Sequence, residues 1–136
     1  MPSQIAHALV GEAALVRADP ESARILLPGP GAAHFLMGCQ GPDIFYHSQR
    51  TRPVALHYGV LVHRRGFGRL VEGMLETWIL EDGEPFSPWA AFLLGFATHG
   101  DLDRSSNTYI VHGYGWTEQG KPETDLFRVC QPFLER

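Results

Sequence analysis

Residues 88–111, PWAAFLLGFATHGDLDRSSNTYIV, predict one long central helix and decide the fold class. Ser87 stands directly before Pro88, which is a helix-start pattern because the hydroxyl caps a free amide and proline suits the first position. The first part of the stretch, residues 89–97, is apolar on nearly every face. This composition predicts burial on all sides in the centre of the domain.

Three polar residues interrupt this apolar helix at helical spacing. His99, Asp103 and Asn107 recur at i, i+4 and i+8, so an α-helix aligns them along one stripe. Burying a carboxylate and an imidazole without partners costs roughly several kcal/mol of folding free energy. A bound cation would provide both groups with a partner. The stripe therefore indicates a metal site. The alternative is a structural His99–Asp103 pair near the end of the helix.

The remaining apolar positions also follow helical spacing, with glycine and proline marking the ends of the segments. The sequence therefore predicts a single all-α domain over residues 1–136. The helices expected besides the central one are residues 3–17, 19–27, 32–37, two consecutive helices within 53–80, and 122–134.

Composition excludes several classes of protein. The formal net charge of −4 opposes polyanions, so no stable nucleic-acid binding is expected. No apolar run approaches the roughly 18–20 residues of a membrane span, and no transmembrane segment or secretory signal is expected, which favours a cytoplasmic protein. The two cysteines form no CxxC motif, which argues against a disulfide framework or a cysteine zinc site.

Several motifs taken together resemble a known family. They are the opening MPSQIAH ending at His7, the turn GCQGPDIFY that contains Asp43, and LGFATH ending at His99 and leading to Asp103. Their order and spacing are similar to those of the bacterial zinc-dependent phospholipase C family, which is related to the fungal single-strand nucleases. The resemblance spans residues 1 to about 116 and implies a multi-helix bundle of that type.

The resemblance also implies a metal centre with a defined set of ligands. In the family, a cluster of up to three zinc ions activates a water molecule that hydrolyses a phosphodiester. The implied metal ligands here are His7, Asp43, His63, His99 and Asp103, with Asp43 as a bridging carboxylate and candidate general base. His57 remains the alternative to His63, because residues six apart face about 240° apart on a straight helix and only one should point inward.

Two departures from the family pattern leave the function open. Asn107-Thr108 stands where the family has His-Pro, and an amide oxygen is a weaker zinc ligand than imidazole. The family also has a further histidine and acidic residue on a downstream helix, and no such pair follows Asp125, so the bundle is expected to be incomplete at its C-terminal end. The implied function is a zinc-dependent hydrolase of phospholipids or other small phosphodiesters. The alternative is an inactive or fragmentary relative that serves as a metal-binding or structural module.

A cationic segment precedes the central helix. Between Ile44 and Val71 the chain has five arginines and no acidic residue. Such a segment favours an anionic headgroup or phosphate. The alternative is an ordinary solvated face that the acidic residues just downstream balance.

Overall fold

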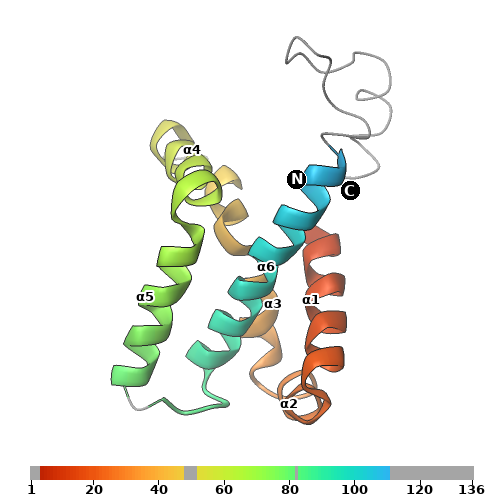
Figure 1. Ribbon diagram of the computed structural model, residues 1–136. Coiled ribbons are helices and arrows are strands. Elements are labelled where there is room, and N and C mark those ends of the chain that lie inside the picture. The colour runs from red at the N-terminus through yellow and green to blue at the C-terminus, as the bar shows by residue number, and fades with distance from the viewer. Residues whose placement is uncertain (1–3, 48–51, 82, 111–136) are drawn as a thin grey trace.

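The computed structural model describes residues 4–47, 52–81 and 83–110. These ranges contain no strand, and they form the all-α, multi-helix bundle that the sequence predicts (Figure 1). The expected helix over residues 122–134 lies outside the described residues. In chain order the elements are α1 Gln4–Ala18, α2 Pro20–Leu26, α3 Ala32–Gln40, the 3₁₀-helix η1 Gly41–His47, α4 Arg52–Leu61, the π-helix η2 Val62–Gly66, α5 Phe67–Leu80 and α6 Pro88–Ile110.

The two helix starts with the clearest sequence signals form as expected. Asp19 caps α2, and its carboxylate accepts a hydrogen bond from the backbone N–H of Ser22 at 3.0 Å. The hydroxyl oxygen of Ser87 accepts a hydrogen bond from the backbone N–H of Ala90 at 3.1 Å. The second cap sets the start of α6, and thereby the positions of its polar residues.

The central contact of the bundle is between α3 and α6, whose backbones approach closely at two glycines. A Cβ atom on Gly38 would collide with the carbonyl of Phe92, and one on Gly95 would collide with the carbonyl of Phe35. The core of buried side chains lies beside this crossing, and α1 and α2 contribute to it. Its members are Leu15, Ala23, Leu26, Phe35, Cys39 and Ala91.

The close approach explains why α3 is longer than the sequence indicates. The prediction that the helix ends at Met37 is wrong, because Gly38 is helical and its missing side chain makes room for α6. The helix ends instead at Gln40, and Gly41 follows with φ of 52°. This is a left-handed conformation that glycine adopts without strain. The turn begins η1, which contains Asp43 as the sequence predicts.

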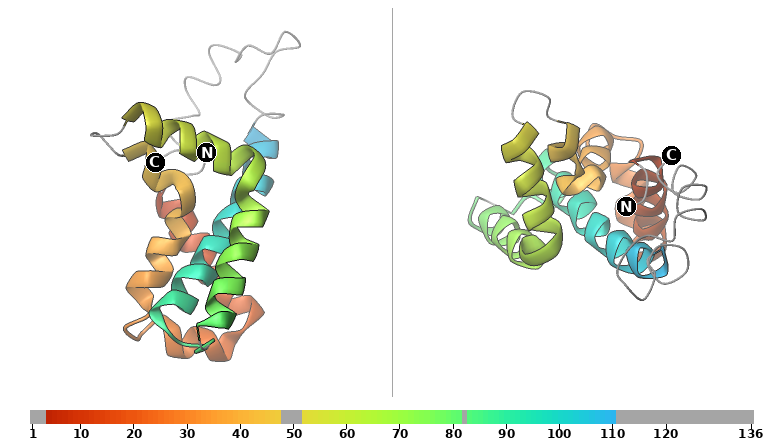
Figure 2. Two further views of the ribbon diagram at one scale, coloured as in Figure 1. Left: turned by 90° about the vertical axis from the view of Figure 1, so that its left-hand side faces the viewer. Right: turned by 90° about the horizontal axis from the view of Figure 1, so that it is seen from above.

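The predicted pair of helices within residues 53–80 is present, with a π-helix at the junction. α4 ends at Leu61, η2 makes one wide turn through Gly66, and α5 begins at Phe67. Figure 2 shows α4 lying across one end of the bundle, at a steep angle to α5. A π-helix turn changes the direction in which the following residues point, and such turns are frequent at functional sites.

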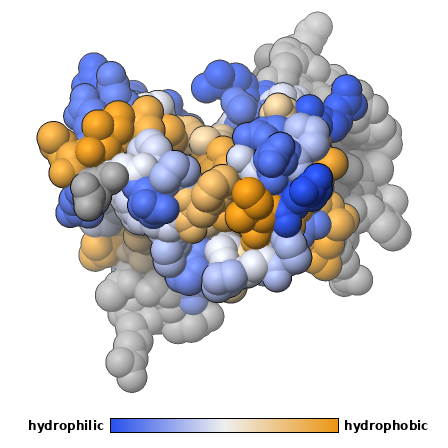
Figure 3. Space-filling view, turned by 90° about the horizontal axis from the view of Figure 1, so that it is seen from below, coloured by the Kyte–Doolittle hydropathy of each residue, from blue (hydrophilic) through white to orange (hydrophobic). Residues whose placement is uncertain are grey.

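The first half of α6 is less enclosed than its composition predicts. Ala91, Leu93 and Phe96 are buried, but Leu94 is 37% exposed, so the prediction of burial on all sides is wrong. The neighbouring helix α5 has no fully buried residue, and a pocket of about 340 Å³ lies between the two helices. Apolar side chains reach the surface at this end of the molecule, opposite α4 (Figure 3). Within the described ranges, no helix is long and apolar enough to cross a membrane.

Candidate metal centre

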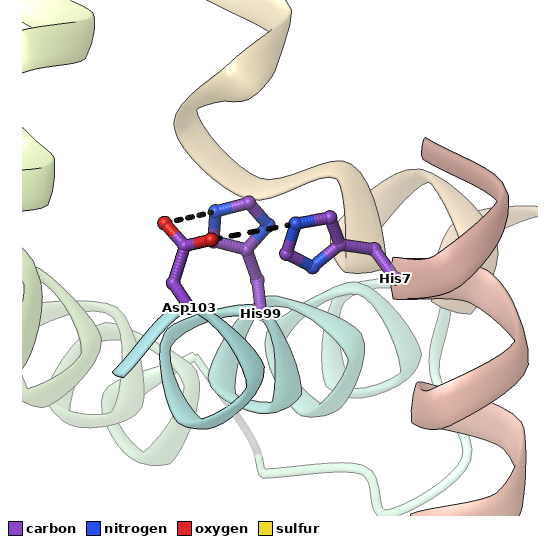
Figure 4. Close-up of side chains that lie close together, drawn as sticks. All are labelled: His7, His99 and Asp103. Atoms are coloured by element: carbon purple, nitrogen blue, oxygen red, sulfur yellow. Dashed lines mark ion pairs between the residues drawn. The ribbon is translucent and has the colours of Figure 1, made fainter. Parts of the chain in front are cut away.

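α6 contributes two residues of a polar cluster buried inside the bundle. His99 is 1% exposed and Asp103 is 8% exposed. Because the two residues are one helical turn apart, their side chains lie on the same face, and His99 Nε2 is 3.7 Å from Asp103 Oδ2 (Figure 4). His99 and Asp103 of the expected stripe therefore point into the protein. Asn107 lies one turn further along α6, and its side chain is outside the part of the chain that the structure describes.

α1 brings His7 against the same face of α6. The His7 ring stacks on the His99 ring with centroids 4.0 Å apart and planes inclined by 14°. Its Nε2 lies 3.6 Å from Asp103 Oδ1 (Figure 4). It also lies 3.9 Å from Asp43 Oδ2, and the residue is 2% exposed. His7 thus lies beside two buried carboxylates.

Asp43 reaches the cluster through the sharp turn at Gly41. A Cβ atom on Gly41 would fall on the ring of His99, so the turn passes directly over that imidazole. Asp43 follows two residues later in η1 and is 5% exposed. The left-handed turn therefore places this carboxylate above the stripe of α6.

The π-helix η2 brings His63 to the cluster. His63 Nε2 lies 3.0 Å from Asp43 Oδ1, 3.4 Å from Asp103 Oδ2 and 3.3 Å from His99 Nε2. His57, the alternative candidate, is exposed on α4, and its ring meets the edge of Tyr58 with centroids 6.3 Å apart. The structure thus brings together His7, Asp43, His63, His99 and Asp103, and it leaves His57 outside.

Backbone carbonyls determine which nitrogen of two rings carries the proton. The Nδ1 atom of His63 lies 2.6 Å from the carbonyl oxygen of Gly59, and that of His99 lies 3.0 Å from the carbonyl oxygen of Cys39. A carbonyl only accepts hydrogen bonds, so each Nδ1 must be the N–H donor. In the neutral rings both Nε2 atoms therefore carry lone pairs, and these lone pairs face each other and the carboxylates.

Several buried atoms of the cluster have no hydrogen-bond partner. They are both ring nitrogens of His7 and Asp103 Oδ1. Asp43 Oδ1 also has no partner while the His63 ring is neutral, because His63 Nε2, 3.0 Å away, can donate to it only when protonated. Buried polar groups without partners are rare, because each loses its hydration without compensation. Two overlapping sets of ligand atoms, His7 with His99 and Asp103, and Asp43 with His63 and His99, lie within 4.8 Å of one another. These buried groups could hold a metal ion, and a cation would satisfy both the lone pairs and the carboxylates.

The electrostatics of the cluster favour neutral imidazoles at two positions. Burial, followed by the charge of the adjacent His99, lowers the pKa of His7 to about 4. Burial also lowers the pKa of His99 and raises the pKa of Asp103. Burial would lower the pKa of His63 as well, but hydrogen bonding to Asp43 and to the Gly59 carbonyl outweighs it and raises that pKa. A proton on His63 and a metal ion would therefore compete for the space between Asp43 and Asp103.

Tyr46 is a neighbour of the cluster that sequence reasoning did not single out. Its ring stacks on His63 with centroids 5.5 Å apart, and its hydroxyl oxygen lies 3.3 Å from His63 Nδ1. Burial, followed by the negative charges of Asp43 and Asp103, raises the pKa of this phenol. Tyr46 lies three residues after Asp43, and a 3₁₀-helix has three residues per turn, so the two side chains lie on the same side of η1. This spacing was the signal in the sequence that could have identified Tyr46.

Comparisons with family models, curated proteins and solved structures give no match. The resemblance to the zinc-dependent phospholipase C family therefore depends on the motifs of this chain alone. The geometry of the cluster is independent of that resemblance.

Proposed function

We propose that the protein is a zinc-dependent phosphodiester hydrolase, similar to the zinc-dependent phospholipases C, whose metal is held by His7, Asp43, His63, His99 and Asp103. One observation carries the proposal: the acceptor nitrogen of His63 faces that of His99 at 3.3 Å, with two carboxylate oxygens at 3.0 and 3.4 Å from the same nitrogen. Such a close approach needs a positive charge between the lone pairs and the carboxylates, and a zinc ion would supply it whenever His63 is not protonated.

The distances support zinc as the ion. Zinc in proteins is bound tetrahedrally by imidazole and carboxylate at about 2.0–2.2 Å, so two ligand atoms of one ion lie roughly 3.3–3.6 Å apart. His63 Nε2 lies 3.0–3.4 Å from its three neighbours, and His99 Nε2 lies 3.7 Å from Asp103 Oδ2. The ligand atoms of Asp43, His63 and His99 lie within 4.8 Å of one another, and three protein ligands of this kind would leave the fourth position of a tetrahedral zinc ion for water.

The ligand set also limits how many ions the described residues would bind. His63 and His99 have only Nε2 available, because each Nδ1 donates to a backbone carbonyl, and such second contacts orient metal-binding histidines. Each of these rings therefore serves one ion. A second ion would lie between His7 Nε2, Asp43 Oδ2 and Asp103 Oδ1. The five residues thus suit one or two zinc ions.

The proposed chemistry assigns roles to the residues of the chain. Bound zinc would supply a water of lowered pKa and would neutralise the phosphate oxygens. Asp43 would help to hold the metal, and its carboxylate would be the general base of the reaction. The Gly59 carbonyl holds the His63 ring, and the Cys39 carbonyl holds the His99 ring, so that both present Nε2. His63 is 12% exposed at its side chain and provides the most open side of the cluster for the substrate.

A second function is a metal-binding module without catalysis. Asn107 supports it, because an amide replaces an imidazole of the family pattern one turn beyond Asp103 on α6. In this case the chain binds zinc but leaves phosphodiesters intact.

Hydrolysis of a soluble substrate distinguishes the two functions. We would load the tag-free protein with zinc and measure release of nitrophenol from bis(4-nitrophenyl) phosphate. Asp43→Asn is expected to lower kcat by roughly 10²–10⁴-fold, the contribution of a general base, whereas His57→Ala should leave it unchanged. Zinc binding without hydrolysis would support the non-catalytic module, and absence of zinc binding would contradict both functions.

A further inference from the structure

Most exposed side chains of α4 are apolar, and His57 is exposed among them. Ala55 and Gly59 are buried on the side of α4 that packs on the bundle. On the other sides, Val54 is 59%, Leu56 46%, Tyr58 53%, Val60 37% and Leu61 42% exposed. We name these five residues the α4 face. A short helix that buries two small residues and exposes five large apolar ones is typical of a helix with a partner outside the chain.

Arginines follow this face directly. Arg64 and Arg65 are exposed on η2, and Arg69 is exposed on the first turns of α5. Within the described ranges, no acidic side chain forms an ion pair with Arg64 or Arg65, and the sequence has no acidic residue from Ile44 to Val71. The local charge is thus strongly positive in a chain whose net charge is −4.

The same turn of helix carries a ligand of the metal centre. His63 lies two residues after Leu61 and directly before Arg64. Its side chain is 12% exposed, which is the highest value among the five residues of the buried cluster. Figure 2 shows α4 lying across one end of the bundle, and the exposed residues of the α4 face therefore belong to that end. A surface that binds the α4 face would lie next to the turn that carries His63.

We propose that the α4 face and the arginines of η2 bind the surface of an anionic lipid bilayer. A helix with apolar residues on one side and arginines beside it binds in the plane of a membrane interface, where apolar area and attraction to anionic lipid act together. With the proposed function, this binding would also bring lipid phosphodiesters to the metal centre, and that consequence rests on the proposed function. The binding itself does not depend on it.

Charge and hydrophobicity favour this partner over two others. A nucleic acid would pair with the arginines but would leave the α4 face exposed to water. A second copy of the chain would cover the apolar residues, but the symmetric contact would bring the same arginines together. An anionic bilayer offers both apolar contact and negative charge.

Vesicle co-sedimentation tests the proposal. We would mix the zinc-loaded protein with vesicles of phosphatidylcholine alone or with added phosphatidylglycerol, at low and at high salt. Binding is expected only with phosphatidylglycerol, and high salt should weaken it. The double variant Arg64→Gln/Arg65→Gln and the single variant Leu61→Ser should each bind at least tenfold more weakly. The control Arg17→Gln/Arg24→Gln removes the same charge from exposed positions of α1 and α2 and should bind as the wild type does.

Three results would overturn the proposal. They are no binding to anionic vesicles, equal losses in the η2 and control variants, and a dimer in light scattering that Leu61→Ser disrupts. Because the readout is binding, its failure differs from a failure of the proposed function. A protein that binds vesicles without hydrolysing any diester keeps this inference, and one that hydrolyses the soluble diester without binding vesicles contradicts it.

Discussion

The Nε2 atoms of His63 and His99 lie 3.3 Å apart, and in the neutral rings neither carries a proton. Nε2 has no proton because Nδ1, on the far side of each ring, carries it. Nδ1 of His63 donates to the carbonyl of Gly59, and Nδ1 of His99 donates to the carbonyl of Cys39. Two lone pairs therefore point at the same small space, together with the carboxylates of Asp43 and Asp103. A metal ion would account for this arrangement, and the first two of the following predictions depend on it.

Loss of His63 should weaken zinc binding more than loss of a nearby histidine. His63→Ala removes the nitrogen that contacts Asp43, Asp103 and His99, and we expect zinc affinity to fall by at least about 100-fold, since even outer-shell changes cost roughly 10–100-fold. His57→Ala on α4 is the matched control and should leave the affinity unchanged. Competition titration with a zinc chelator measures both. Equal affinities in the two variants would show that His63 is not a ligand.

Zinc should stabilise the fold. The ligands come from α1, η1, η2 and α6, so the ion would join segments that separate on unfolding. A ligand at 100 times its Kd contributes about 2.7 kcal/mol, which corresponds to a rise in Tm of roughly 10 °C for a domain of this size. Thermal unfolding followed by circular dichroism, with zinc and with chelator, measures the shift. Coincident curves would mean that no ion joins these segments.

In the metal-free protein, His7 should lower the stability of the fold in mild acid. The pKa of His7 is about 4 in the folded protein against 6.5 when unperturbed, so between these pH values the unfolded chain binds a proton that the folded chain does not. The contribution of His7 to stability therefore falls as pH decreases from 6.5 towards 4, by up to about 3 kcal/mol. The lowered pKa of His99 acts in the same direction, and the raised pKa values of His63 and Asp103 act in the opposite direction. Urea unfolding at several pH values should show a flatter dependence for His7→Asn, and the exposed His34→Asn should resemble the wild type.

Two glycine substitutions should have opposite effects on stability. Gly95→Ala places a methyl group against the carbonyl of Phe35 at the α3–α6 crossing, and overpacking of this kind costs roughly 1–3 kcal/mol. Gly73→Ala on α5 meets no atom within 4 Å and should stabilise the helix by roughly 0.5–1 kcal/mol. Urea unfolding of the two variants measures the difference. A Gly95→Ala protein as stable as Gly73→Ala would contradict the close crossing.

The sequence predicts the helices well where local signals are strong. Ser87 and Asp19 begin α6 and α2 as expected, because capping depends on residues close in the chain. It fails at Gly38, because the propensity of glycine to break a helix is overridden by close packing against α6. The exposure of Leu94 was also not predictable, since it depends on how closely α5 covers α6.

The candidate site was predictable only in part. The i, i+4 spacing identifies His99 and Asp103 as neighbours on one face, but only the resemblance connects them with His7 and Asp43 on other segments. The choice between His57 and His63 depends on the π-helix η2, which no periodicity of the sequence reveals. The contact between Tyr46 and His63 depends on the same turn.

The most direct test of the central claim is the metal content of the protein purified without chelator and without a histidine tag. Inductively coupled plasma mass spectrometry should find one or two zinc ions per chain, and His99→Ala should reduce that number. A wild-type chain that contains no zinc, and that takes up none when zinc is added to the folded protein, would contradict the account.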